Sequence, residues 1–172
     1  MSAPIRNSIR ILGLDPGLRR TGWGLIAVEG ARLSWIGHGV IAPDDKAPFA
    51  ERLLTLFEGV AALVEAHRPD EAAIEETFAT ANGSSTLKLG HARAAAILGA
   101  ARAGLTVGEY APSEVKKAVV GTGAADKTQV AFMVQRLLPA SKGVSADAAD
   151  ALAVAVCHAH ARSLKRRIGD AA

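Results

Sequence analysis

The sequence predicts an α/β domain with a five-stranded mixed sheet, in the strand order 3-2-1-4-5, flanked by helices. Apolar runs over residues 9–15, 21–30 and 33–41 are separated by turn residues, which predicts three consecutive antiparallel strands. Apolar residues at three- and four-residue spacing then predict a helix over 48–67. The short run 71–75 follows this helix, so a right-handed crossover would place it parallel to the first strand.

The composition is that of one packed domain. The chain has 172 residues, a hydrophobic fraction of 49% and a mean hydropathy of +0.19, which exclude a disordered protein. Aromatic residues make up only 4%, so the core is expected to consist of aliphatic side chains. We assign residues 1–162 to the domain and 163–172 to a basic C-terminal tail that we expect to fray.

Charge and cysteine content restrict the cellular setting. A net charge of +3 and a pI near 9.3 are compatible with a polyanionic partner. The single cysteine, Cys157, excludes an internal disulfide and fits a reducing compartment. The N-terminus has no apolar segment typical of a signal peptide, and no apolar run approaches 18 residues. We therefore expect a cytoplasmic protein with no membrane span.

The stretch 9–24 contains the first candidate site residue. A buried strand ends at Asp15, and Pro16-Gly17 then forces a turn, so this carboxylate is expected at the rim of the sheet. The glycines of the returning strand, Gly22 and Gly24, would let a ligand backbone or a metal approach closely. Taken alone, Asp15 could equally serve only to cap the turn.

The middle of the chain predicts a helix rich in small residues. Ser84 or Ser85 can cap a helix over 86–103, in which glycine and alanine occur on more than one side. Such a helix can pack closely on two surfaces. We expect one to be the sheet and propose a second subunit for the other.

The rest of the chain predicts a strand and three helices. The strand covers 105–110 and is the last of the sheet. Ser113, Asp126 and Ser145 are the expected N-caps of the three helices. The helices are expected to end at Val120, before Pro139 and near Arg162.

Further carboxylates occur where the predicted fold could bring them close to Asp15. Asp147 and Asp150 are three residues apart on the last helix, which places both on one face within an apolar surrounding. Glu75 and Glu76 end the fourth strand, and strand alternation sends them to opposite faces. Only one of the two can therefore join Asp15, and spacing alone does not decide which.

Clustered carboxylates predict a metal site. Strands one and four are neighbours in the order 3-2-1-4-5, so their ends would bring acids together under the last helix. Four carboxylates repel one another unless cations neutralise them. Oxygen ligands select hard ions, Mg²⁺ with Mn²⁺ as a substitute, and two such ions are the usual means of phosphodiester hydrolysis.

Several stretches of the chain, taken together, resemble the RuvC family of bacterial Holliday junction resolvases, within the ribonuclease-H-like nucleases. The resemblance covers nearly the whole chain. The matching stretches are LGLDPGLRRTGWG from Leu12, AIEETF from Ala73, NGSSTLKLGHARA from Asn82, VKKAVVGTGAADKTQV from Val115 and ADAADALAVAVCHAH from Ala146.

The resemblance implies a ribonuclease-H-like fold and a junction endonuclease acting in DNA recombination and repair. The implied enzyme is a homodimer that nicks two like strands of a four-way DNA junction symmetrically and works with the RuvA and RuvB branch-migration proteins. It also implies particular site residues. The metal-binding catalytic acids would be Asp15, Glu75, Asp147 and Asp150, with about two ions per site, and the DNA contacts would be Lys116, Lys127 and Phe78.

Three residues depart from the family pattern. Trp23 replaces a usual tyrosine, His91 a usual glutamine and Ala94 a frequent glycine, which affects local contacts and not the chemistry. Parts of the sequence are also compatible with two other functions. One is a catalytically silent junction binder, which the presence of all four acids disfavours. The other is an actin-like ATPase, for which the chain is too short to supply both domains.

Overall fold

The computed structural model describes residues 8–77 and 81–169, with 165–169 described by their backbone alone. Its sheet has five strands in the order β3-β2-β1-β4-β5, as predicted. The strands are β1 (Ile9–Asp15), β2 (Thr21–Glu29), β3 (Arg32–Ile41), β4 (Glu71–Glu75) and β5 (Val107–Tyr110). The helices are α1 (Phe49–His67), α2 (Gly83–Ala101), α3 (Pro112–Val120), α4 (Lys127–Leu137), the 3-10 turn η1 (Pro139–Ser141) and α5 (Ala146–Gly169).

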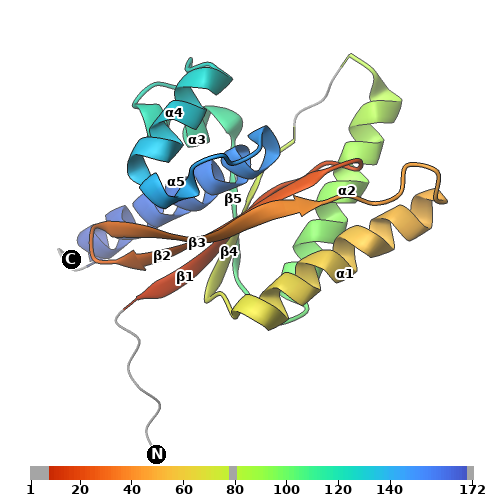
Figure 1. Ribbon diagram of the computed structural model, residues 1–172, viewed down its shortest axis with the longest axis horizontal. Coiled ribbons are helices and arrows are strands. Elements are labelled where there is room, and N and C mark those ends of the chain that lie inside the picture. The colour runs from red at the N-terminus through yellow and green to blue at the C-terminus, as the bar shows by residue number, and fades with distance from the viewer. Residues whose placement is uncertain (1–7, 78–80, 170–172) are drawn as a thin grey trace, which may run out of the picture.

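The sheet is the middle of three layers (Figure 1). Helices α1 and α2 cover one face, and α3, α4 and α5 cover the other. β1 pairs antiparallel with β2 and parallel with β4. The connection through α1 therefore brings β4 parallel to β1, as predicted. In this register Leu14 pairs with Ile74, which leaves Asp15 and Glu75 side by side at the end of the two central strands.

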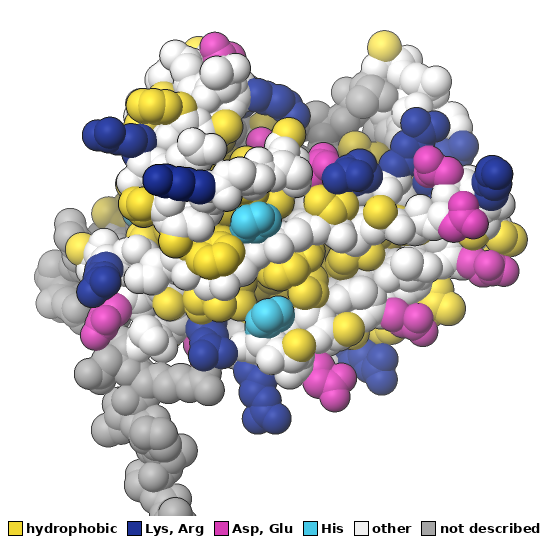
Figure 2. All heavy atoms as spheres, in the orientation of Figure 1, with side chains coloured by type: hydrophobic (Ala, Val, Ile, Leu, Met, Phe, Trp, Pro, Cys, Tyr) yellow, Lys and Arg dark blue, Asp and Glu magenta, His cyan; other side chains and the backbone are white. Residues whose placement is uncertain are grey.

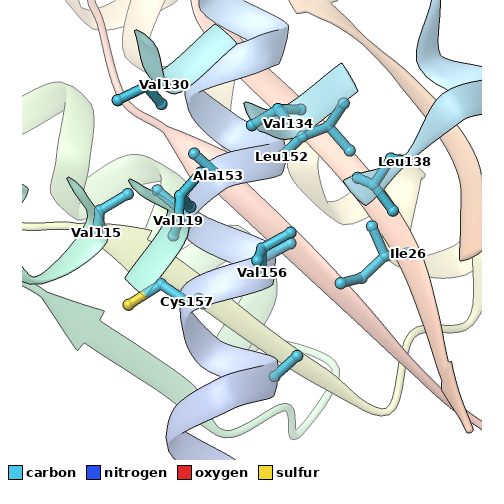
Figure 3. Packing of buried hydrophobic residues seen from close by; sticks show 14 of the residues in the cluster. Ile26, Val115, Val119, Val130, Val134, Leu138, Leu152, Ala153, Val156 and Cys157 are labelled. Carbon is cyan, nitrogen blue, oxygen red and sulfur yellow. The ribbon is translucent and has the colours of Figure 1, made fainter. Parts of the chain in front are cut away.

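Strand alternation divides the core into two parts. Leu12, Leu14 and Ile74 pack with α1 and α2 on one face of the sheet. Ile11 and Ala73, on the opposite face, belong to the cluster around α5, part of which is seen in Figure 3. Asp15 and Glu75 follow the same two-residue period as Ile11 and Ala73. Both carboxylates therefore belong to the face that α5 covers.

Helix α5 lies directly on the backbone of β1 and β2. A Cβ atom built on Gly13 would lie 2.1 Å from the Ala151 carbonyl oxygen, and one on Gly22 would lie 2.0 Å from that of Asp147. The close approach of a ligand or a metal was predicted at Gly22 and Gly24. The structure places α5 against both positions instead, which brings the first turns of this helix to the site.

Helix ends show several differences from the sequence predictions. The prediction that Ser84 or Ser85 caps α2 is wrong, because the Asn82 side chain accepts hydrogen bonds from both of their amides. Ser113 is not the cap of α3, which begins at Pro112 with Ala111 as its N-cap. Asp126 caps α4 as predicted, accepting a 2.8 Å bond from the Gln129 amide.

The last helix is longer than expected. It was predicted to end near Arg162, but α5 continues to Gly169. The fraying of the basic tail 163–172 stays a prediction. Within residues 8–77 and 81–169, no helix has both the length and the apolar character needed to span a membrane.

Candidate active site

Three of the predicted acids line one cavity. Asp15, Glu75 and Asp150 surround a space of about 250 Å³, together with Lys116 and Lys127. The acids come from the ends of β1 and β4 and from the second turn of α5, whereas the lysines come from α3 and α4. In Figure 2 the surface is hollowed between the lobe formed by α3 and α4 and the upper end of α2.

The carboxyl groups of Asp15 and Glu75 are the most perturbed acids of the site. Burial, followed by the charges of Glu75 and Asp150, raises the pKa of Asp15 from 3.8 to about 7. Burial and the charge of Asp150 also raise the pKa of Glu75. Both carboxyl groups are therefore destabilised as free anions, by burial and by the charges of the neighbouring acids.

Glu75 and Glu76 lie in different surroundings. Glu75 lines the cavity, and Glu76 lies beyond the last residue of the strand, where its amide donates to the Tyr110 carbonyl oxygen. Strand alternation explains why Glu75 lies at the cavity: Ala73 and Glu75 point to the same face of the sheet, the face that α5 covers.

Asp147 and Asp150 differ in their surroundings. Lys127 Nζ lies 3.2 Å from Asp150 Oδ2, and the nearby acids, Asp150 first, raise the pKa of this lysine. Asp147 is not among the residues that line the cavity. Its Oδ2 accepts a 2.7 Å hydrogen bond from Arg20 Nε, although its charge still contributes to the raised pKa of Asp15.

Two of the three residues predicted to contact DNA lie at the acidic cavity. Lys116 and Lys127 both line the acidic cavity, and each lowers the pKa of Glu75 by its charge. Phe78 lies outside the described residues. On the face seen in Figure 2, Lys and Arg side chains are spread over several elements with Asp and Glu among them.

Two arginines near the site were not assigned from the sequence. Arg93 Nε donates to the Glu75 carbonyl oxygen at 3.1 Å, and its guanidinium pairs with Glu109. Arg20 pairs with Asp147 from the loop before β2. Each arginine is far in the sequence from the acid that it contacts, so residue spacing could not predict these contacts.

Two of the three residues that depart from the family pattern, Trp23 and His91, make contacts within the chain. The Trp23 ring lies 5.7 Å from that of His67 and covers Gly39, where a Cβ atom would be 2.7 Å from the indole nitrogen. His91 Nδ1 is 2.6 Å from the Leu87 carbonyl oxygen, and its ring meets Phe49 edge-on. These substitutions are accommodated away from the acidic cavity.

Comparison with known proteins gives consistent matches. The family model described as "Crossover junction endodeoxyribonuclease RuvC" matches residues 11–158. The RuvC proteins of Caulobacter sp. strain K31 and Caulobacter vibrioides are 64% and 66% identical. The alignments cover 95% and 92% of this chain and 96% and 94% of theirs.

A solved structure agrees with these sequences. The structure of "T. thermophilus RuvC in complex with Holliday junction substrate" superposes with a TM-score of 0.85 at 32% identity, covering 91% of this chain and 96% of that one. Its fold is the ribonuclease-H-like fold that the resemblance implied. The chain therefore belongs to the RuvC family of crossover junction endodeoxyribonucleases.

Proposed function

We propose that this chain resolves four-way Holliday junctions in DNA by paired symmetric nicks during recombination and repair. Its family is that of crossover junction endodeoxyribonucleases. The observation that carries the proposal is the convergence of Asp15, Glu75 and Asp150 on one cavity beside Lys116 and Lys127. Acids that can hold metal ions next to cations that can bind phosphate are what phosphodiester hydrolysis requires.

The donor set fits hard divalent cations. Among residues 8–77 and 81–169, no three Asp, Glu, His or Cys side chains already form a closed set of metal ligands. However, Asp15 and Glu75 are held together with raised pKa values, and a bound cation would relieve their repulsion. All candidate donors are carboxylate oxygens, which suit Mg²⁺ or Mn²⁺. We propose about two ions, held by Asp15, Glu75, Asp147 and Asp150.

Each side chain then has a role in hydrolysis. When bound, the ions supply an activated water and neutralise charge on the phosphate. Asp15 and one of the α5 acids would hold the ions, and Glu75 would hold an ion and orient the attacking water. Asp150 would complete the set of ligands. Lys116 and Lys127, once a phosphate enters the cavity, stabilise the negative charge that develops on it.

The proposed assembly extends beyond one chain. We propose a homodimer with two such sites, acting in the cytoplasm with RuvA and RuvB. Leu87 and Leu98 on α2 are 67% and 59% exposed, which supports an apolar contact there. Phe78 is proposed to stack on junction bases, on the basis of the family resemblance.

Three substitutions test the assignment of the acids. Asp150→Asn and Glu75→Gln are expected to abolish cleavage of a synthetic four-way junction in Mg²⁺ and to keep junction binding in a gel-shift assay. Glu76→Gln is the matched control, because Glu76 lies next to Glu75 but outside the cavity, and it should cleave like the unmodified protein. Undiminished cleavage by either of the first two variants would refute the assignment.

A further inference from the structure

Both acids of α5 are engaged by cations of the same chain. Arg20 Nε lies 2.7 Å from Asp147 Oδ2, and Lys127 Nζ lies 3.2 Å from Asp150 Oδ2. Lys127 already has a proposed role toward DNA. Arg20 has none, although it contacts a proposed metal ligand directly.

The position of Arg20 is defined by the backbone around it. Its loop is closed by Thr21, which is fully buried; the Thr21 hydroxyl donates to the Gly17 carbonyl oxygen at 2.9 Å and accepts from the Gly17 amide. Directly after it, Gly22 touches the backbone of Asp147, where a Cβ atom would lie 2.0 Å from the carbonyl oxygen. The start of β2 and the start of α5 are therefore held together, and this brings the guanidinium to the carboxylate.

The ion pair is nevertheless easy to open. The Arg20 side chain is 55% exposed and that of Asp147 is 35% exposed. Pairs exposed to water in this way are weak and are screened by salt. The guanidinium can leave the carboxylate without being buried elsewhere, and an arriving phosphate offers it two oxygens in a favourable geometry.

We infer that Arg20 is a positioning residue that occupies Asp147 before DNA binds and releases it when a junction phosphate takes up the guanidinium. The inference rests on the proposed metal site. In the DNA-free protein Arg20 competes with the metal ion for Asp147. Phosphate binding removes this competitor, so junction binding and metal binding strengthen each other. Such a device favours metal loading where a substrate is present.

The first test is the Mn²⁺ affinity of the DNA-free protein, measured by calorimetric titration. Arg20→Gln is expected to bind Mn²⁺ about two- to five-fold more tightly, as the loss of a weak competing pair implies. Arg20→Lys should restore weaker binding. Arg19→Gln is the matched control, since Arg19 is the neighbouring residue, is 82% exposed and lies 3.9 Å from Asp45. It should bind like the unmodified protein.

The outcomes separate this inference from the metal site itself. Suppose that Asp147→Asn binds Mn²⁺ clearly more weakly than the unmodified protein. Unchanged or weaker Mn²⁺ binding by Arg20→Gln would then show that Arg20 does not compete with the metal ion for Asp147. If Asp147→Asn bound Mn²⁺ like the unmodified protein, the proposed metal site would fail and the inference with it.

The second test concerns the phosphate. In EDTA, Arg20→Gln should bind a four-way junction more weakly than the unmodified protein, and the slope of log affinity against log salt should fall by about one. Unchanged binding and slope would show that DNA does not take up the guanidinium, and would overturn the proposed release.

Discussion

At the scale of single residues, Asp15 is the most informative group of the site. It ends a buried strand, and it shares its cavity with two other carboxylates, Glu75 on the neighbouring strand and Asp150 on α5. Burial first, and then the charges of Glu75 and Asp150, raise its pKa from 3.8 to about 7. In the absence of a metal ion, this carboxyl group is therefore more easily protonated than an ordinary aspartate.

The raised pKa predicts how stability depends on pH. Between about 4 and 7 the folded protein binds the Asp15 proton more tightly than the unfolded chain, so stability falls as pH rises through this range. In EDTA, the free energy of unfolding should fall by up to about 4 kcal/mol, at about 1.36 kcal/mol per pKa unit. Urea unfolding of the unmodified protein and Asp15→Asn measures this, because the variant lacks the titrating group.

The control is the same measurement in saturating Mg²⁺, which takes the place of the proton. The free energies of unfolding of the two proteins should then depend on pH in the same way. Parallel pH profiles in EDTA would show that Asp15 has an ordinary pKa and that the acids are not crowded in solution.

At the scale of elements, the site depends on how α5 sits on the sheet. Gly13, Gly22 and Gly24 allow its backbone and Leu152 to approach β1 and β2. Their lack of side chains is what brings Asp147 and Asp150 to the ends of the strands. Asp150 then reaches the cavity, whereas Asp147 stays beside it on Arg20.

A single methyl group on β2 should disturb this arrangement. Gly22→Ala is expected to lower the free energy of unfolding by about 1–3 kcal/mol, because its Cβ atom would overlap the Asp147 carbonyl oxygen. It should also reduce junction cleavage. Gly90→Ala is the control: apart from its chain neighbours and the backbone of its own helix, no atom of the described residues lies within 4 Å of its Cβ position on α2. Helix propensity should therefore raise stability by up to about 1 kcal/mol.

Denaturant unfolding of both glycine variants measures the difference. Equal stability of Gly22→Ala and the unmodified protein would mean that α5 does not rest on β2 as closely as the structure shows.

Local sequence patterns predicted the elements well but their ends less well. The apolar runs and the helical stripe specify the strands, the crossover and the sheet order, because burial on one or two faces imposes their periods. The N-caps of α2 and α3 were misassigned because Asn82 competes with two serines and because Pro112 can begin a helix. Caps depend on one or two local hydrogen bonds, and several nearby residues can provide them.

The site was predicted less completely than the fold. Asp15, the α5 acids and the β4 glutamates are visible from strand ends and helical spacing, but choosing Glu75 required the family resemblance. The Arg20–Asp147 and Arg93–Glu75 contacts join residues far apart in the chain. Such contacts follow from tertiary packing, on which spacing within one segment carries no information.

At the scale of the whole molecule, the exposed leucines of α2 test the proposed dimer. Leu98→Glu is expected to give a monomer by light scattering, because it places a charge in the proposed apolar contact. Phe132→Glu is the matched control: Phe132 on α4 has the same exposed fraction, 59%, on the opposite layer of the domain. A dimeric Leu98→Glu variant would remove α2 from the interface.

We propose that the acidic cavity makes this chain a metal-dependent enzyme specific for four-way junctions. The most direct measurement is cleavage of a synthetic four-way junction in Mg²⁺, beside a linear duplex of the same sequence, with the nicked strands mapped on a sequencing gel. Paired symmetric nicks are expected in the junction alone. Binding without nicking in both Mg²⁺ and Mn²⁺, or equal cutting of the duplex, would contradict it.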